Sequence, residues 1–125
     1  MTYLYGVNFV KVARGSTLQL TVESVWEDVD TSSKFDFTGA TFLFTIKRYR
    51  DDQVPLFHAR GVAGVRFVVD SPKSGKVVFS MTGTETAALP SGTHYYDFWV
   101  LDTAGQSYQL VENAEFEVTQ GITIR

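Results

Sequence analysis

The amino-acid sequence predicts an all-β protein, an antiparallel β-sandwich of about seven to nine strands. Apolar and polar residues alternate along most of the chain, as is typical of strands with one buried face. Turn-forming residues interrupt this alternation about every 8–12 residues, which is the spacing of strands in a sandwich. Aromatic residues make up 14% of the chain, including ten Phe and six Tyr, and these residue types favour strands.

The length and composition of the chain indicate one globular domain over residues 1–125. Hydrophobic residues make up 44% and charged residues 20%, values close to globular averages that exclude disorder as the main state. A chain of this size buries about two thirds of its surface, so it needs neither a metal nor disulfides to fold. The absence of cysteine excludes disulfides, a thiol nucleophile and a cysteine zinc site.

Strands are expected on both sides of a polar loop in the first third of the chain. Residues 17–26 alternate as a half-buried strand. Its apolar face comprises Leu18, Leu20 and Val22. Residues 27–37 are polar and irregular, which predicts a long loop, and Gly39 is expected to supply a positive φ in the following turn.

The middle of the chain predicts four strands. Residues 41–49 and 76–82 alternate, residues 65–70 are expected to form a strand, and residues 54–59 are expected to form a short one. Pro55 places that short strand at the edge of a sheet, because proline cannot donate to a strand ladder. The apolar faces comprise Phe42, Phe44 and Ile46 in the first strand, and Val77, Phe79 and Met81 in the last.

One helical turn is expected near residues 83–89. Thr82 and Glu85 have the spacing of a capping box, in which the threonine hydroxyl accepts from an amide three residues on and the glutamate reaches back. Pro90 ends the helix. Leu89 is expected to cover one end of the sandwich.

A central strand is expected over residues 94–102, since both of its faces are largely apolar. Trp99 lies in this strand and is expected to be buried. After a hairpin turn, residues 107–112 and 115–118 are expected to form two strands separated by a break at Asn113.

Charge and hydropathy exclude several classes of partner. The net charge is −3, and a broad basic surface for nucleic acid is missing. No apolar run approaches the roughly 18 residues of a membrane-spanning helix. The first ten residues lack the features of a secretory signal, so we expect synthesis in the cytoplasm.

The charges are unevenly distributed along the chain. Residues 34–73 hold seven Lys or Arg against four Asp or Glu, whereas residues 74–125 hold two against six. Faces of opposite sign would help head-to-tail or heterologous assembly. An ordinary solvated surface would give the same counts.

No reactive constellation emerges from the sequence, so we expect no enzyme, no cofactor and no metal site. His58 and His94 stand apart from other ligands, whereas zinc takes three or four clustered ones. Asp97 has no second carboxylate at a catalytic spacing, so an ion pair or a solvent-facing position is favoured. The short acidic pairs in loops lack the regular spacing of a calcium loop, and nucleophile-elbow and phosphate-loop motifs are absent.

Three stretches of the chain carry a family resemblance. The first two are Arg14-Gly15-Ser16-Thr17 and Asp36-Phe37-Thr38-Gly39-Ala40-Thr41. The third and most specific is Glu85-Thr86-Ala87-Ala88-Leu89-Pro90-Ser91-Gly92-Thr93-His94-Tyr95-Tyr96-Asp97-Phe98. In order and spacing they resemble a family of small proteins and domains from tailed bacteriophages. Ser16 stands where that family usually has an acidic residue.

The resemblance implies an immunoglobulin-like sandwich similar to the N-terminal domain of upper baseplate proteins, which fastens receptor-binding proteins to the tail. It therefore implies a virion structural protein, synthesised in the host cytoplasm and located in the tail or baseplate rather than the head. Such a protein would act as a tail, baseplate or tail-fibre adaptor through contacts with other virion proteins in a symmetric oligomer. Because the chain stops soon after the predicted sandwich, we expect a free-standing domain.

The two ends of the chain are the predicted partner contacts. Tyr3 and Tyr5 lie in an aromatic stretch, and Ile122 and Ile124 alternate like an edge strand. Exposed edges can accept a strand from a partner. Truncating both ends is expected to abolish assembly and leave the fold intact. The alternative is that both ends simply complete the sheets.

Two other functions remain open. One is capsid (head) decoration, and the other is a carbohydrate-binding module in which Trp26, Trp99 and tyrosines stack on sugars. The exposure of the tryptophans distinguishes the carbohydrate-binding module from the structural roles.

Overall fold

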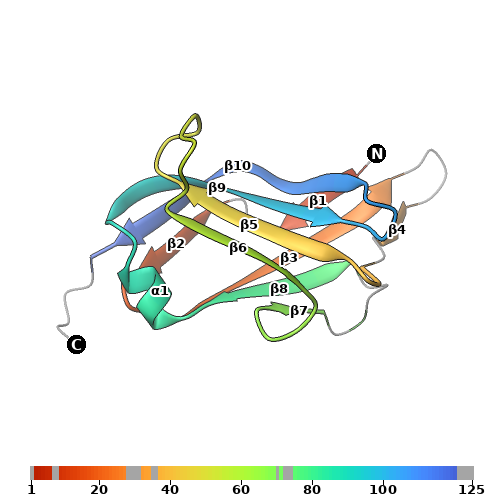
Figure 1. The fold of residues 1–125 in the computed structure, drawn as a ribbon, viewed down its shortest axis with the longest axis horizontal. Helices are drawn as coiled ribbons and strands as arrows, with labels where there is room; N and C mark the ends of the chain where they lie inside the picture. Colours follow the sequence, from red (N-terminus) through yellow and green to blue (C-terminus); the bar gives the residue numbers. More distant parts are fainter. Residues whose placement is uncertain are drawn as a thin grey trace.

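The computed structural model describes residues 2–6, 9–27, 32–34, 37–69, 71 and 75–120. These residues form two β-sheets packed in a sandwich-like arrangement, with one short helix at one end (Figure 1). The expectation of an all-β sandwich is confirmed at this level. The described part contains ten strands, two of which are only two or three residues long.

The first sheet is antiparallel throughout and has the order β1-β3-β8-β7. Its strands are β1 (Thr2–Gly6), β3 (Leu18–Glu27), β8 (Lys76–Met81) and β7 (Phe67–Val68). A short strand, β4 (Ser32–Lys34), pairs with the end of β3. The loop expected over residues 27–37 therefore contains a strand, because three polar residues return along β3.

The second sheet has the order β2-β10-β9-β5-β6. Its strands are β2 (Val10–Ala13), β10 (Ser107–Thr119), β9 (Gly92–Leu101), β5 (Thr41–Lys47) and β6 (Phe57–Val62). All neighbours are antiparallel except β2, which runs parallel to β10. The N-terminal region thus supplies a strand to each sheet.

The core lies between the sheets and is rich in phenylalanine. Phe44 of β5 is fully buried and stacks on Phe79 of β8, with ring centroids 4.0 Å apart. Phe98 of β9 meets both rings edge-on. The apolar faces expected for β5 and β8 are confirmed, because every residue assigned to them is buried. The alternation of the sequence therefore predicted these two buried faces correctly.

Several expected strand boundaries differ from the structure. The strand expected over residues 54–59 begins only after Pro55, as β6, and its edge position is confirmed. The two strands expected on either side of Asn113 form one strand, β10, whose register with β9 shifts there. An extra residue in one strand can be absorbed as a bulge without ending the strand.

Trp99 was expected to be buried, but it is not. The inward positions of β9 are His94, Tyr96, Phe98 and Val100, so Trp99 falls on the outer face of the sheet, where it is half-buried. The central position of β9 is confirmed. Because both faces of this strand are apolar, its alternation does not reveal which face is inside.

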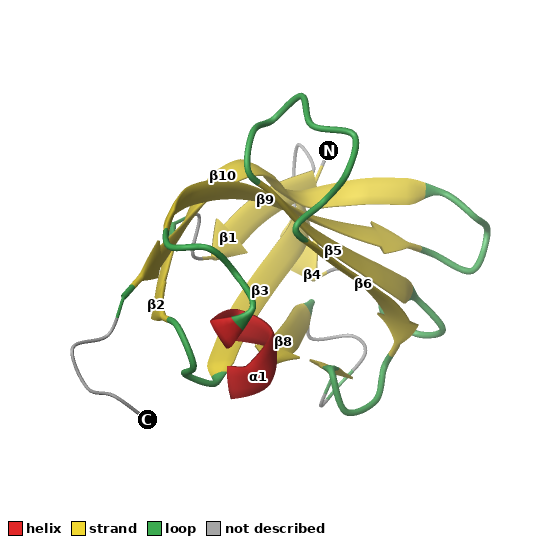
Figure 2. Cartoon of the chain, turned by 60° about the vertical axis from the view of Figure 1, so that its left-hand side comes forward, coloured by secondary structure: helices red, strands yellow, loops and turns green. Residues whose placement is uncertain are grey.

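The helix α1 (Gly83–Ala87) closes one end of the sandwich, directly after β8 (Figure 2). Its predicted capping box is present, because the Thr82 hydroxyl accepts from the Glu85 amide at 3.2 Å and the Glu85 carboxylate accepts from the Thr82 amide at 2.9 Å. Leu89 follows the helix and is buried, as expected. Gly39 has the predicted positive φ, at 67°.

Candidate interaction surface

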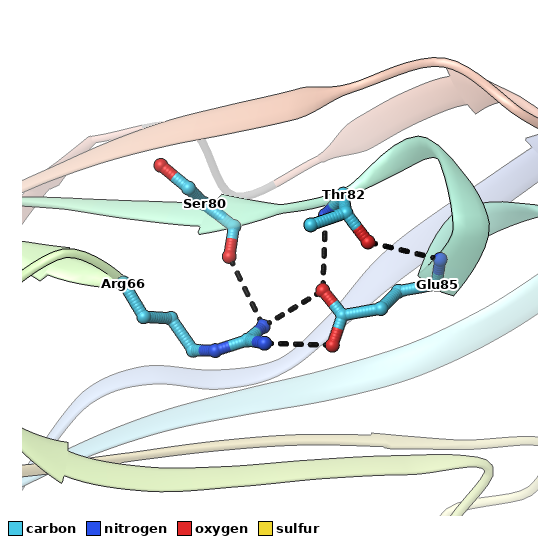
Figure 3. Close-up of polar contacts among 4 residues, drawn as sticks. All are labelled: Arg66, Ser80, Thr82 and Glu85. Atoms are coloured by element: carbon cyan, nitrogen blue, oxygen red, sulfur yellow. Dashed lines mark hydrogen bonds and ion pairs between the residues drawn. The ribbon is translucent and has the colours of Figure 1, made fainter.

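An ion pair ties the loop after β6 to helix α1 (Figure 3). Arg66 donates to both carboxylate oxygens of Glu85, at 3.0 Å to Oε1 and 2.7 Å to Oε2. It also donates to the carbonyl oxygen of Ser80 at 3.2 Å. The hydrogen bonds from Arg66 hold the pKa of Glu85 below its ordinary value. The same carboxylate thus caps the helix and fixes the loop.

Arg66 also lies over the ring of Phe57, with its guanidinium carbon 5.5 Å from the ring centroid. Phe57 is the first residue of β6, and Arg66 comes four residues after that strand ends. One side chain therefore connects the start of β6, the loop after it and α1. This arrangement fixes the position of the edge of the second sheet.

Two of the stretches that carry the resemblance meet in a buried joint. The Thr86 side chain of α1 is fully buried; its hydroxyl donates to the Ser16 carbonyl at 2.7 Å and accepts from the Gly15 amide at 3.1 Å. Gly83 packs so closely that an added Cβ would lie 2.5 Å from the Gly15 carbonyl oxygen. The two stretches are about 70 residues apart in the chain, so this joint helps to close the sandwich.

Arg14 extends the same joint. Its guanidinium donates to the Ala87 carbonyl at 2.8 Å and to the Gln120 side chain at 3.0 Å. An open hollow of about 530 Å³ lies beside the joint. Its lining comprises Gly15, Thr17, Gly83, Thr84 and Ala87. None of these side chains is charged or titratable, so the hollow offers no catalytic chemistry.

Of the four predicted contact residues, the structure places two, and only by their backbone. Tyr3 and Tyr5 lie in β1, where their backbone pairs with Val25 and Glu23, and their side chains lie outside the described part. Ile122 and Ile124 lie outside the described residues. Because β1 completes the first sheet, removing it would uncover the edge of β3. The effect of N-terminal truncation on the fold therefore stays a prediction.

The outer face of β9 carries Asp97, the carboxylate considered above for catalysis. Asp97 is half-buried there and lines a small hollow with Tyr95, Lys47 and Arg50. The hollow has a volume of about 20 Å³, enough for a single water molecule and too small for a substrate. Arg50 lies over the Tyr95 ring at 4.8 Å from its centroid and covers that aromatic surface.

The two histidines lie in different places. His94 is buried in β9, and its Nε2 atom lies 2.7 Å from the Pro90 carbonyl oxygen. His58 is exposed on β6, with its Nδ1 atom 2.9 Å from the Thr45 hydroxyl. Across the described ranges, no group of three His, Asp or Glu side chains could hold a metal ion. In the same ranges, no helix has the length and apolar character needed to cross a membrane.

The edge of the second sheet formed by β6 is the surface that sequence reasoning missed. Exposed apolar side chains gather on this strand and the segments on either side of it. They are Val54, Leu56, Val62, Val65 and Val68. Val65 is 94% exposed and Val54 is 80% exposed. We call this strand and these five side chains the β6 edge. A concentration of exposed apolar side chains marks an interaction surface.

No protein-family model matches the chain, and no curated protein matches it.

Proposed function

We propose that the chain is an immunoglobulin-like structural domain of a tailed-phage virion, acting as a tail, baseplate or tail-fibre adaptor. The strand order supports the fold assignment. The order β1-β3-β8-β7 corresponds to an A-B-E-D sheet, and β10-β9-β5-β6 corresponds to a G-F-C sheet extended by one further strand. The phage assignment rests on the resemblance of the three sequence stretches.

The β6 edge is the observation that carries the adaptor role. It combines an open strand with exposed apolar side chains on a scaffold whose core is closely packed. Such a surface fits protein–protein contact. Of the two hollows described above, the larger is lined by uncharged residues and the smaller holds no more than one water molecule. The domain thus presents a fixed surface to other virion proteins in a symmetric assembly.

The copy number of the protein in purified particles tests this role. Quantitative mass spectrometry of gradient-purified phage carrying this gene would give that number directly. We expect tens of copies or fewer, as for a symmetric adaptor of the tail or baseplate. Hundreds of copies would favour the alternative of a capsid decoration. Complete absence from particles would refute a virion role.

The outward position of Trp99 supports a second candidate, a carbohydrate-binding module. Trp99 and Tyr95 point to the same outer face of β9, and aromatic rings on a sheet face can stack on sugars. Arg50 covers the Tyr95 ring, which leaves Trp99 as the main stacking surface. A change in tryptophan fluorescence on titration with a glycan panel would favour this candidate, with Trp99→Leu as the matched loss-of-response variant.

A further inference from the structure

The backbone of β6 is open along one side. Within the described residues, β6 pairs with β5 and with no strand on its other side. Proline is absent from Phe57–Val62, so every residue of the strand has a backbone N–H. An open strand of this length can receive a further strand through main-chain hydrogen bonds.

The apolar side chains around this strand distinguish it from an ordinary edge. Six of the seven exposed large hydrophobic residues in the described part fall within residues 49–68. Scattered exposed apolar residues need no explanation, but so many in one segment that contains an open strand favour contacts with a partner. Val62, on β6 itself, is 64% exposed and lies on the same outer face as Arg60.

The charge around the β6 edge is positive. Residues 47–68 contain five Lys or Arg and two Asp, and even with Arg66 paired to Glu85 the positive charges outnumber the negative ones. Arg60 is exposed in the middle of β6, on the outer face opposite Leu43. Positive charge beside an open strand favours a partner that carries acidic side chains.

A second copy of this chain does not supply such a strand. Pairing of β6 with its own copy would bring two Arg60 side chains close together, which is unfavourable. The other edge strands in the described part are β1, β2, β4 and β7, and none contains an acidic residue. No edge strand in the described part of a second copy therefore complements the β6 edge, and we assign the added strand to a different protein.

We infer that the β6 edge binds an extended segment of a partner protein, in which apolar and acidic side chains alternate, by adding it as a sixth strand to the second sheet. The acidic side chains meet Arg60 on the outer face. The apolar ones turn to the inner face, beside half-buried Phe57 at the edge of the core. This inference rests on the proposed adaptor role only where it takes the partner to be a virion protein. The binding itself can be measured with the isolated chain.

The test uses two dye-labelled octapeptides, one alternating glutamate with valine and one alternating lysine with valine. Fluorescence anisotropy with the full chain is expected to show binding of the glutamate peptide at about micromolar or weaker affinity, as for a small interface. The lysine peptide is expected to bind at least about tenfold more weakly, because it places like charges beside Arg60. Hydrogen exchange should slow in Phe57–Val62 and stay unchanged in Val10–Ala13.

Two variants make the same charge change at opposite edges of one sheet. Arg60→Glu is expected to weaken binding of the glutamate peptide about tenfold and to improve binding of the lysine peptide. Lys11→Glu, on exposed β2, is expected to change both affinities less than about twofold. Matching thermal midpoints for the two variants would show that folding does not explain the difference.

The outcomes separate this inference from the proposed function. Equal binding of both peptides, binding without slowed exchange in β6, or no binding at millimolar peptide would each overturn the inference. If the chain binds the glutamate peptide at β6 but is absent from phage particles, the virion role is overturned and the inference stands. Presence in particles without peptide binding would overturn the inference alone.

Discussion

Replacing Thr86 by valine tests whether the buried joint stabilises the sandwich. The substitution keeps the size and shape of the side chain and removes the hydroxyl that bonds Ser16 and Gly15. Both backbone partners are partly buried, so each loses a hydrogen bond that water does not fully replace. Leaving buried polar groups unpaired costs about 1–3 kcal/mol, and we expect about 2 kcal/mol here.

The expected loss converts into a measurable change in the thermal midpoint. With an unfolding entropy of about 2.1 cal/mol/K per residue over 125 residues, 2 kcal/mol lowers the midpoint by about 8 °C. Differential scanning calorimetry at neutral pH would measure this shift.

Thr84→Val is the matched control, because Thr84 is exposed on the same helix. It is expected to change the free energy of unfolding by less than about 0.5 kcal/mol. Equal shifts for the two variants would refute the claim that the Thr86 hydroxyl stabilises the joint. A preserved urea m-value would show that the loss reflects the native contact rather than a change in the unfolded chain.

Three further substitutions test other parts of the fold. Gly83→Ala should destabilise the protein by about 1–3 kcal/mol because the new methyl group meets backbone, whereas Gly64→Ala should be tolerated; urea denaturation would compare them. Glu85 has a lowered pKa, so its contribution to stability is present above the unfolded-state pKa and is lost as pH falls through the lower folded-state value. Glu85→Gln should therefore weaken the fold at neutral pH and flatten the loss of stability below about pH 4.3, as followed by chemical denaturation across pH. Phe44→Ala should cost about 3–5 kcal/mol, because it empties the centre of the aromatic core, and a cost below 1 kcal/mol in calorimetry would contradict that packing.

Much of the fold was predictable because its signals are local. A strand with one buried face must alternate, so Phe42, Phe44 and Ile46 reveal their face without knowledge of the neighbouring strands. The capping box at Thr82 and Glu85 was equally predictable, since its hydrogen bonds join residues three apart. These elements depend on sequence spacing alone.

Other features depend on contacts that spacing does not encode. The face on which Trp99 lies is set by which side of β9 meets the first sheet, and both sides are apolar. The continuity of β10 past Asn113 depends on a register shift against β9, which a break in alternation does not distinguish from a turn. The N-terminal stretch suggested a partner contact because it is aromatic, but as β1 it also completes a sheet.

The β6 edge escaped sequence analysis for a related reason. Val62, Val65 and Val68 are residue types that are common in a core, but their side chains are exposed in the structure. Pro55 did predict an edge, but it carries no information about whether the edge has a partner. An interaction surface made of ordinary strand residues therefore becomes visible only when strand order is known.

The stretches that carry the resemblance and the proposed binding surface occupy different parts of the molecule. Thr86 and Gly15 form a buried joint, Gly39 forms a turn, and Tyr96 and Phe98 lie in the core. These positions determine how the sandwich closes. Residues 47–68 lie outside all three stretches, and they contain the open strand, the exposed valines and the excess positive charge. The residues that close the sandwich can stay the same while the residues of the β6 edge change. The partner must therefore be sought through the chemistry of the β6 edge rather than through the resemblance.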